Sequence, residues 1–437
     1  MGHMGHLKQE YRDLVRRLDA GTVGLPEPVD PTAWTGWKDI LEIMYTPEEA
    51  AIGAKLPVLP SSLRRVAKQV GMSEEELEPK LNAMADKGLV MDLVSPTSGK
   101  TRWMLAPPVI GFFEFSLMRV KDENIDQAAM AKAMGAYMYG DPAFAEDVFG
   151  GETTIGRSVA HEGTVAEESS EVADWEQAQA IVKGARRHAV SICYCRHKAE
   201  HLGRACKAPQ EICMSLDAGA DFVVHRKFGR EITRQEAMGL LEEAREHKLV
   251  HIVDNVRDKP TYICACCGCC CGQLSAINQW DLQAVSPSGF LPRHDEDLCT
   301  GCSRCSRACP ISAITMEPKR QPGKPKNTLR PQVREERCIG CGVCAIACPK
   351  DAMPLRRSET PRPLPVNSMD KTIRMAMERG RLAHLIVDEG ASRGHQFLNG
   401  ALRALTRLPP AKRALASEQI KSRFVAQALK SVPDPTG

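Results

Sequence analysis

The sequence predicts an α+β fold built from several domains, and three observations lead to this prediction. The chain has 437 residues, which is more than one small domain needs and indicates two to four units. Its first quarter carries helix-start signals followed by two strand-like runs. Its 18 cysteines all lie between Cys193 and Cys348 in dense groups, which is typical of metal-ligand clusters and not of a dispersed disulfide framework.

Residues 1–35 are expected to form a leading helix and a linker. The segment Leu7–Leu18 has helical character, and Gly24 and Pro26 lie in the linker that follows. Charged residues are spread through Met1–Ala20 without an apolar core, so this is not a secretory signal peptide. No apolar run approaches the roughly 18 residues that a spanning helix needs. We therefore expect a cytoplasmic protein.

Residues 36–107 are expected to fold as three short helices followed by a β-hairpin. The helices are predicted to begin after Thr46, run over Ser62–Val70 and begin again after Ser73, and the strands to be Leu89–Val94 and Thr101–Leu105. Thr46 and Ser73 each precede a glutamate by three positions, which makes a capping box. This arrangement resembles a winged helix-turn-helix domain.

The resemblance implies DNA binding, but the charge of the third helix opposes it. That helix carries Glu74, Glu75, Glu76, Glu78 and Asp86 against Lys80 and Lys87. Helices that enter the major groove face closely spaced phosphates and are usually basic. We therefore expect this domain to dock a protein or to act as a scaffold, and a DNA partner is disfavoured.

Residues 108–190 are expected to be a mostly helical connecting region. An amphipathic helix is predicted around Ile125–Met138, where methionine recurs at every fourth residue from Met130. Such a stripe fills a core more often than it binds a soft metal. The acidic stretch from Glu146 to Asp174 is expected to be a loop.

Residues 191–292 hold ten cysteines in two arms. The first arm contributes Cys193, Cys195, Cys206 and Cys213, and the second contributes Cys264, Cys266, Cys267, Cys269, Cys270 and Cys271. Between them, a capping box at Thr233 starts a predicted helix that ends near Leu249. We therefore expect a helical cysteine-rich centre in which this helical unit brings the two arms together.

Three kinds of chemistry fit these ten thiols. The first is one or two iron–sulfur clusters, with the first arm as one ligand set and four of the six later cysteines as another. The second is structural zinc, for which Cys264 and Cys267, or Cys266 and Cys269, form C-x-x-C pairs. The third is a reactive dithiol, formed by Cys266 with Cys267 or by Cys269 with Cys270.

Residues 293–352 carry one cysteine pattern twice. Each copy reads C-x-x-C-x-x-C-x-x-x-C-P, with Cys299, Cys302, Cys305 and Cys309 in the first and Cys338, Cys341, Cys344 and Cys348 in the second. This spacing lets three thiolates on a tight loop and a fourth from a remote segment surround a [4Fe–4S] cluster. The segment resembles the bacterial two-cluster ferredoxins.

This resemblance implies two [4Fe–4S] clusters whose fourth ligands are exchanged between the copies. One cluster would be held by Cys299, Cys302, Cys305 and Cys348, and the other by Cys338, Cys341, Cys344 and Cys309. We interpret the spacer Glu317–Arg337 as a surface insertion. Two clusters directly downstream also favour iron in the cysteine-rich centre, so we expect one or two further iron–sulfur clusters there.

The combination of a winged-helix-like domain, a cysteine-rich centre and this ferredoxin-like module resembles the long iron–sulfur ferredoxin proteins of anaerobic bacteria, a class of electron carriers. The adjacent cysteines of the second arm also resemble the paired thiols of heterodisulfide reductase-type subunits, although their spacing differs. No flavin or dinucleotide fingerprint follows a predicted strand, so hydride chemistry is expected in a partner.

Residues 353–437 are expected to form a basic, helical C-terminal tail. From Pro354 onward there are fifteen Lys or Arg and seven Asp or Glu, a difference of +8, whereas the whole chain has a net charge of +3. Such a surface fits an acidic partner or an anionic membrane surface, and a solvated helical cap packed on the body is the alternative. Helices are predicted at about Ser368–Glu389, His395–Leu408 and Pro410–Ser431.

These observations favour a cytoplasmic protein that relays single low-potential electrons to or from a partner oxidoreductase, itself dependent on flavin or metal. Two alternatives stay open. One is an iron–sulfur redox sensor whose winged helix binds DNA. The other is a reductase subunit that acts on a sulfur or thiol substrate through a cluster or reactive thiols between Cys264 and Cys271. The sequence identifies no catalytic residue.

Overall fold

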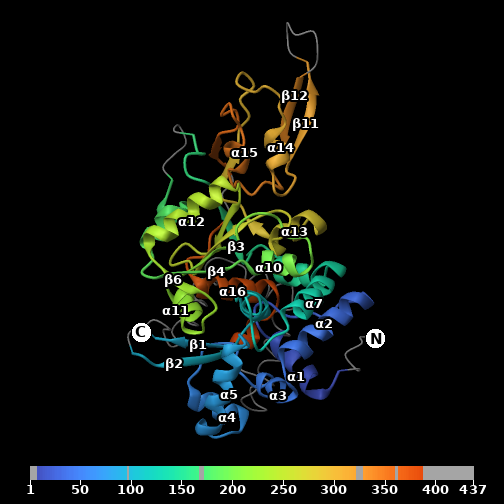
Figure 1. Ribbon diagram of the computed structural model, residues 1–437, viewed down its shortest axis with the longest axis vertical. Helices are drawn as coiled ribbons and strands as arrows, with labels where there is room; N and C mark the ends of the chain where they lie inside the picture. The colour runs from blue at the N-terminus through green and yellow to red at the C-terminus, as the bar shows by residue number, and fades with distance from the viewer. Residues whose placement is uncertain (1–6, 96–97, 167–171, 321–327, 360–362, 387–437) are drawn as a thin grey trace, which may run out of the picture.

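The core of the molecule is a seven-stranded mixed sheet (Figure 1). The computed structural model describes residues 7–95, 98–166, 172–320, 328–359 and 363–386. The strand order is β6-β4-β5-β8-β7-β3-β9, and every neighbouring pair is antiparallel except β3 and β9. The strands are β3 (Gly156–Val159), β4 (His188–Ile192), β5 (Glu211–Leu216), β6 (Arg230–Ile232), β7 (Val250–Asp254), β8 (Tyr262–Cys266) and β9 (Val285–Ser286).

This sheet corrects the expectation of a helical cysteine-rich centre. The capping box at Thr233 is confirmed and starts α12 (Arg234–Glu246), but the helices of this region pack on a sheet that was not expected. All five residues of β7 are buried, so the strand lacks the alternation that marks a half-exposed strand in a sequence. In addition, β4 runs across the predicted boundary at residue 190, and β3 lies within the stretch expected to be an acidic loop.

Helices cover both faces of the sheet. α9 (Ala178–Gly184) and α12 pack against Val190 of β4, whereas α11 (Ala218–His225) packs against Ala189 of the same strand. Successive side chains of a strand point to opposite faces, so these helices lie on opposite sides. α10 (Tyr194–His201) and α13 (Gly272–Trp280) follow β4 and β8, and a cysteine is the residue directly before each helix.

The N-terminal part contains the predicted three helices and hairpin. Its elements are α1 (Gln9–Leu18), α2 (Pro31–Met44), α3 (Pro47–Gly53), α4 (Leu63–Val70), α5 (Glu74–Asp86), β1 (Val90–Val94) and β2 (Thr101–Leu105). Both predicted capping boxes form, and β1 pairs with β2. α2 was not expected: Pro31, in the stretch expected to be a linker, is its first residue, and Asp30 caps it. The winged-helix assignment stays a prediction.

The connecting region packs the N-terminal part onto the sheet. It contains a π-type turn (Pro108–Phe112), α6 (Phe113–Phe115), α7 (Gln127–Gly140), α8 (Ala143–Phe149) and a short 3-10 helix (Asp174–Glu176). The methionines of α7 are buried, so their predicted role in the core is confirmed. A Cβ on Gly36 of α2 would lie 2.5 Å from the carbonyl oxygen of Ala133, so α2 and α7 are in backbone contact.

The ferredoxin-like module stands at one end of the long axis in Figure 1. It comprises β10 (Phe290–Pro292), α14 (Arg304–Ala308), β11 (Ile314–Lys319), β12 (Thr328–Val333), α15 (Val343–Ile346) and β13 (Leu355–Arg357). β10 pairs with β13 and closes the module, and β11 pairs with β12. The spacer between the two cysteine runs therefore extends a hairpin, whose residues 321–327 lie outside the described part of the chain.

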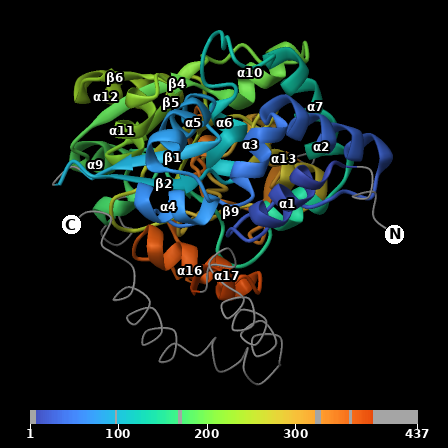
Figure 2. The same ribbon diagram turned by 90° about the horizontal axis from the view of Figure 1, so that it is seen from below.

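The C-terminal helices α16 (Ser368–Glu378) and α17 (Leu382–Ile386) lie beneath the body in Figure 2. They confirm the start of the first helix predicted for the tail. The remaining predicted tail helices fall in residues 387–437, outside the described part of the chain. Within the described part, no helix combines the length and the apolar character needed to cross a bilayer.

Candidate functional site

The cysteines of the ferredoxin-like module line two separate hollows. Cys299, Cys302, Cys305 and Cys348 line one, which we call the outer hollow. Cys309, Cys338, Cys341 and Cys344 line the other, which we call the inner hollow. Each hollow thus takes three cysteines from one run and the fourth from the other run, as the predicted ligand exchange requires. Cluster binding at these cysteines stays a prediction.

The surroundings of both hollows suit [4Fe–4S] clusters. The backbone N–H of Ala313 donates to Sγ of Cys309 over 3.2 Å, and the N–H of Ala352 donates to Sγ of Cys348 over 3.3 Å. Such N–H bonds stabilise thiolates and are a main influence on cluster potential. Gly340 has a φ of 64°, and a Cβ there would lie 2.1 Å from the carbonyl oxygen of Phe290, so the ligand loop requires glycine.

The two hollows differ in exposure. Cys302 of the outer hollow is exposed, whereas Cys341 and Cys344 of the inner hollow are buried. Burial raises the pKa of Cys338 to about 11 and raises the pKa of Cys344 strongly. The outer hollow is therefore the accessible one, and the inner hollow faces the body of the protein.

The inner hollow touches the turn that carries the late cysteines. This thiol turn comprises Cys267–Cys271 and joins β8 to α13. A Cβ on Gly268 would lie 2.1 Å from the carbonyl oxygen of Pro310, the residue after Cys309. Asn278 of α13 donates to the Pro310 carbonyl over 3.0 Å. Two polypeptide segments far apart in sequence thus meet in backbone contact.

A second contact joins the inner hollow to the sheet. The backbone N–H of His161, just after β3, donates to the carbonyl oxygen of Cys341 over 3.3 Å. A Cβ on Gly342 would lie 2.7 Å from Oγ1 of Thr164. The ligand loop of the inner hollow is therefore held by the sheet and by the thiol turn.

Six of the ten upstream thiols form a closed ring inside the body. This thiol ring consists of Cys193, Cys195, Cys213, Cys264, Cys266 and Cys271. Each thiol shifts the pKa of the next in the order Cys195, Cys193, Cys213, Cys264, Cys266, Cys271 and back to Cys195. Two members of the ring lie on adjacent strands. Met214 of β5 pairs with Ile263 of β8, so the next pair along this antiparallel register places Cys213 opposite Cys264. The thiol of Cys213 lowers the pKa of Cys264 to about 6.

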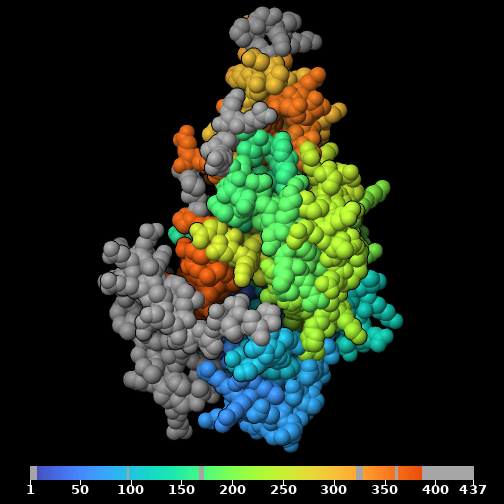
Figure 3. All heavy atoms as spheres, turned by 90° about the vertical axis from the view of Figure 1, so that its left-hand side faces the viewer, coloured from blue at the N-terminus to red at the C-terminus, as the bar shows by residue number. Residues whose placement is uncertain are grey.

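The thiol ring lines a cavity of about 1480 Å³. Its walls also include Phe222 of α11 and Ser368 of α16. Figure 3 shows the face of the molecule on which α11 (yellow-green) and α16 (red-orange) lie. Arg186 and Arg187 on the wall pair with Asp221 over 2.5 and 2.8 Å, so the charges there are largely compensated. The cavity thus combines a group of thiols with a mostly apolar wall, to which Phe115, Phe149 and Phe222 belong.

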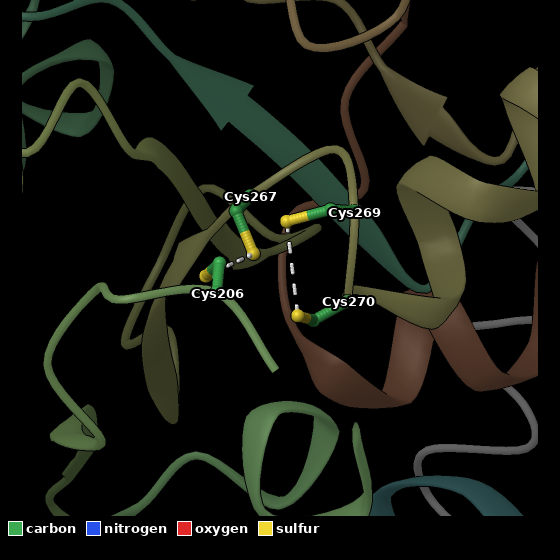
Figure 4. Close-up of side chains that lie close together, drawn as sticks. All are labelled: Cys206, Cys267, Cys269 and Cys270. Carbon is green, nitrogen blue, oxygen red and sulfur yellow. Dashed lines mark hydrogen bonds between the residues drawn. The ribbon is translucent and has the colours of Figure 1, made fainter. Parts of the chain in front are cut away.

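The other four upstream thiols lie together outside the ring (Figure 4). This four-thiol group consists of Cys206, Cys267, Cys269 and Cys270, and its Sγ atoms all lie within 4.8 Å of one another. The structure therefore does not bring Cys206 together with Cys193, Cys195 and Cys213, as the first ligand set expected. It also separates Cys264 from Cys267 and Cys266 from Cys269, the pairs considered for zinc, because one member of each pair faces the ring.

Two further residues near the thiols were not found from the sequence. Arg196 is buried and donates to the carbonyl oxygens of Pro209 and Ala265 over 3.1 and 2.6 Å. Burial alone lowers the pKa of Arg196, but the thiolates of Cys193 and Cys267 outweigh it and raise the pKa.

Glu114 is the second such residue, and it lines the cavity. Burial raises the pKa of Glu114 to about 7, although the N–H of Gly111 donates to the carboxylate over 3.0 Å. Its one sequence signal is a lone charge within the apolar segment Val109–Met118. A carboxyl group of this pKa exchanges protons near neutral pH beside the thiol ring.

The helix that would enter a DNA groove in a winged-helix domain, α5, is in contact with the sheet domain. Arg226, which follows α11, donates to Asp92 of β1 over 3.0 and 2.5 Å and to Asp86 of α5 over 2.9 Å. Its guanidinium also bonds to Asn82 of α5 over 2.7 Å. Part of the surface of α5 is therefore used within the chain.

The comparisons with known proteins identify one segment. A family model described as a 4Fe-4S dicluster domain matches residues 298–352, which contain all eight cysteines of the two hollows. No curated protein and no solved structure matches the chain. The match supports a ferredoxin-like iron–sulfur segment, and with the cysteine clusters upstream it supports iron–sulfur electron transfer.

Proposed function

We propose that this chain relays single electrons between a partner oxidoreductase and a further iron–sulfur cluster that cysteines of the thiol ring would hold at the central cavity. When bound in the two hollows, [4Fe–4S] clusters would supply one-electron redox chemistry. The chain's own residues hold the eight thiolates, shield the inner four from water and place them against the thiol turn. The relay then runs from the exposed end of the module to the cavity, in either direction.

One observation carries this proposal: a continuous apolar core joins the inner hollow to the thiol ring. Cys341, Val343 and Ile311 of the module belong to the same buried cluster as Cys266 and Cys271 of the ring. The contact between Gly268 and Pro310 closes this path without an intervening side chain. A dry, close-packed interface of this kind keeps two redox groups in fixed contact.

The outer hollow has the properties of a docking site for an acidic redox partner. Arg304 and Lys350 lie on its rim beside the exposed Cys302, and both are exposed. A neighbouring cavity of about 510 Å³ is lined by Arg304, Arg307 and Lys248. Opposite charge on a partner would steer association to this end of the molecule. The partner we propose carries flavin or metal, because this chain shows no dinucleotide fingerprint.

The experiment that tests the relay counts electrons. The full chain, purified without oxygen, is titrated with a reduced low-potential dye while its absorbance and EPR spectra are followed. Two ferredoxin-type clusters take about two electrons per chain. We expect the wild-type protein to take more than this number, and the Cys213→Ser variant, which opens the thiol ring, to fall to about two. An uptake of about two electrons by both proteins would overturn the relay.

The cavity favours a second candidate, a reductase that acts on a sulfur or thiol substrate at the thiol ring. A cavity of about 1480 Å³ is larger than an electron carrier needs, and the buried Glu114 offers a proton beside the thiols. Iodoacetamide treatment of the holo protein, followed by mass spectrometry, tests for a reactive thiol. Alkylation within Cys264–Cys271 supports this candidate, and complete protection contradicts it.

A further inference from the structure

The four-thiol group differs in its dimensions from the two ferredoxin quartets. Sγ of Cys206 lies 3.6 Å from Sγ of Cys267, and Sγ of Cys270 lies 3.7 Å from Sγ of Cys269. Four sulfurs bound at about 2.3 Å to one tetrahedral ion lie about 3.8 Å from one another. The two measured pairs therefore have the separation that a single ion requires.

A [4Fe–4S] cluster requires a wider arrangement. Each of its four thiolates binds a different iron, so the sulfurs must surround a body of eight atoms and not one ion. Within the described part of the chain, neither ferredoxin quartet meets the 4.8 Å limit that the four-thiol group meets. The four cysteines around each hollow of the ferredoxin-like module are thus more widely spaced than the four cysteines of the four-thiol group.

The ligands come from two segments, as in many structural zinc sites. Three of them, Cys267, Cys269 and Cys270, lie on the thiol turn, and Cys206 comes from the connection between α10 and β5 (Figure 4). Gly268 stands between the ligands of the turn, where its missing side chain allows the contact with Pro310. An ion here would tie the α10–β5 connection to the turn that faces the inner hollow.

The charges around the group also suit a divalent cation. Arg196 is the nearby buried cation, and it is shared with the thiol ring. One guanidinium does not balance four thiolates, whereas a divalent ion with four thiolates leaves a net charge of −2 that Arg196 partly offsets.

We propose that Cys206, Cys267, Cys269 and Cys270 bind a single Zn²⁺ ion in a closed, structural site. Zinc accepts four thiolates in a tetrahedron, has no redox chemistry and keeps no open position when all four ligands are protein atoms. This site is separate from the relay: it fixes the geometry of the thiol turn and takes no electron. The inference does not depend on the proposed function.

The test measures zinc, iron and acid-labile sulfide per chain. The full protein is prepared without oxygen and without a metal-binding tag, as wild type, as Cys206→Ser and as Cys213→Ser. We expect about one zinc per wild-type chain, since four thiolates close one site. After equilibration with a chelator that leaves the wild-type zinc in place, Cys206→Ser should contain well below one zinc per chain, because even partners outside the coordination shell change affinity by 10- to 100-fold. Iron and sulfide should stay unchanged in this variant.

The control variant Cys213→Ser belongs to the thiol ring and should keep its zinc. Loss of iron and sulfide together in Cys206→Ser would overturn the proposal in favour of a cluster. Loss of iron without sulfide would overturn the assignment to zinc, and unchanged metal content would overturn the site itself. If Cys206→Ser does not fold, zinc-edge X-ray absorption of the wild-type protein decides: four sulfurs at about 2.3 Å support the site, and any other first shell contradicts it.

Discussion

Gly268 and Pro310 are in backbone contact: a Cβ atom added to Gly268 would lie 2.1 Å from the carbonyl oxygen of Pro310. Gly268 belongs to the thiol turn, and Pro310 follows a cysteine of the inner hollow. No side chain larger than hydrogen fits at this position without moving one of the two segments. The contact is therefore the most direct place to separate the ferredoxin-like module from the thiol ring by mutation.

The Gly268→Ala variant should weaken the junction between the module and the thiol turn. The added methyl overlaps with backbone and not with a flexible side chain, so we expect a loss of stability of about 1–3 kcal/mol. We also expect slower reduction of the centre at the thiol ring after the ferredoxin-type signals are reduced. Stopped-flow absorbance with a fast reductant separates the two phases.

Gly239→Ala is the matched control for this variant. Gly239 lies in α12 and has no atom near the position of a Cβ, so alanine should fit there and stabilise the helix by about 0.5–1 kcal/mol. Its reduction kinetics should equal those of the wild-type protein. Equal reduction kinetics in Gly268→Ala and Gly239→Ala would show that the contact between Gly268 and Pro310 has no role in the electron transfer.

The ligand exchange in the module is tested by the fourth cysteine of each run. In Cys348→Ser, we expect alkylation of Cys299, Cys302 and Cys305, although these cysteines lie about forty residues earlier in the chain. The spatial reason is that Cys348 lines the outer hollow with them. Mass spectrometry after iodoacetamide treatment identifies the freed thiols.

The reciprocal variant Cys309→Ser should expose the cysteines of the inner hollow instead, namely Cys338, Cys341 and Cys344. Alkylation of the cysteines from the mutated run itself, in either variant, would show that each run binds its own cluster.

The sequence was sufficient to group the eight cysteines of the module because their spacing is local and repeated. The structure places Cys348 beside the first run and Cys309 beside the second, which is the grouping that the resemblance implied. Three of the four cysteines in each group lie within a few residues of one another. The spacing alone does not show which run supplies the fourth cysteine of each group; the resemblance to two-cluster ferredoxins implied it.

The cysteine-rich centre could not be grouped in this way, because its pairings are set by strands far apart in sequence. Cys264 and Cys266 lie on β8 and belong to the thiol ring, whereas the next residue, Cys267, lies past the end of the strand and belongs to the four-thiol group. Cys206 lies beside Cys267, which comes 61 residues later in the sequence. The strands β4 and β7 also escaped prediction, because strands buried on both faces give no alternating pattern.

Removing Arg226 should strongly destabilise the contact between the winged-helix-like domain and the sheet domain. Its partner Asp92 is 4% exposed, so Arg226→Met leaves a buried carboxylate without its main cation. Breaking a buried pair in this way costs about 3–5 kcal/mol. The loss should appear as a lower midpoint of thermal unfolding.

Arg230→Met is the matched control, because Arg230 pairs with Glu211 and Glu236 on the surface. Exposed pairs of this kind contribute about 0–1 kcal/mol. Similar midpoints for the two variants would mean that Arg226 has no special role in holding the domains together.

Asp19 should make stability depend on pH through its burial between the N-terminal and C-terminal parts of the chain. Burial raises the pKa of Asp19 from its ordinary value of 3.8 to about 6, although the N–H of Leu25 donates to its carboxylate over 2.8 Å. Arg381 opposes the rise in pKa and Asp147 adds to it, and these two residues form an ion pair with each other.

The direction of the pH effect follows from this raised pKa. The folded protein holds the proton more tightly than the unfolded chain, so the neutral carboxyl stabilises the fold fully below a pH of about 3.8 and loses this effect as the pH rises through about 6. Asp19→Asn keeps an oxygen that accepts from Leu25 and removes the titration. We therefore expect the variant to gain stability relative to the wild-type protein as the pH rises from about 4 to about 6. Urea unfolding at a series of pH values measures this difference, and a difference that stays constant over the interval would show that Asp19 is not the titrating group.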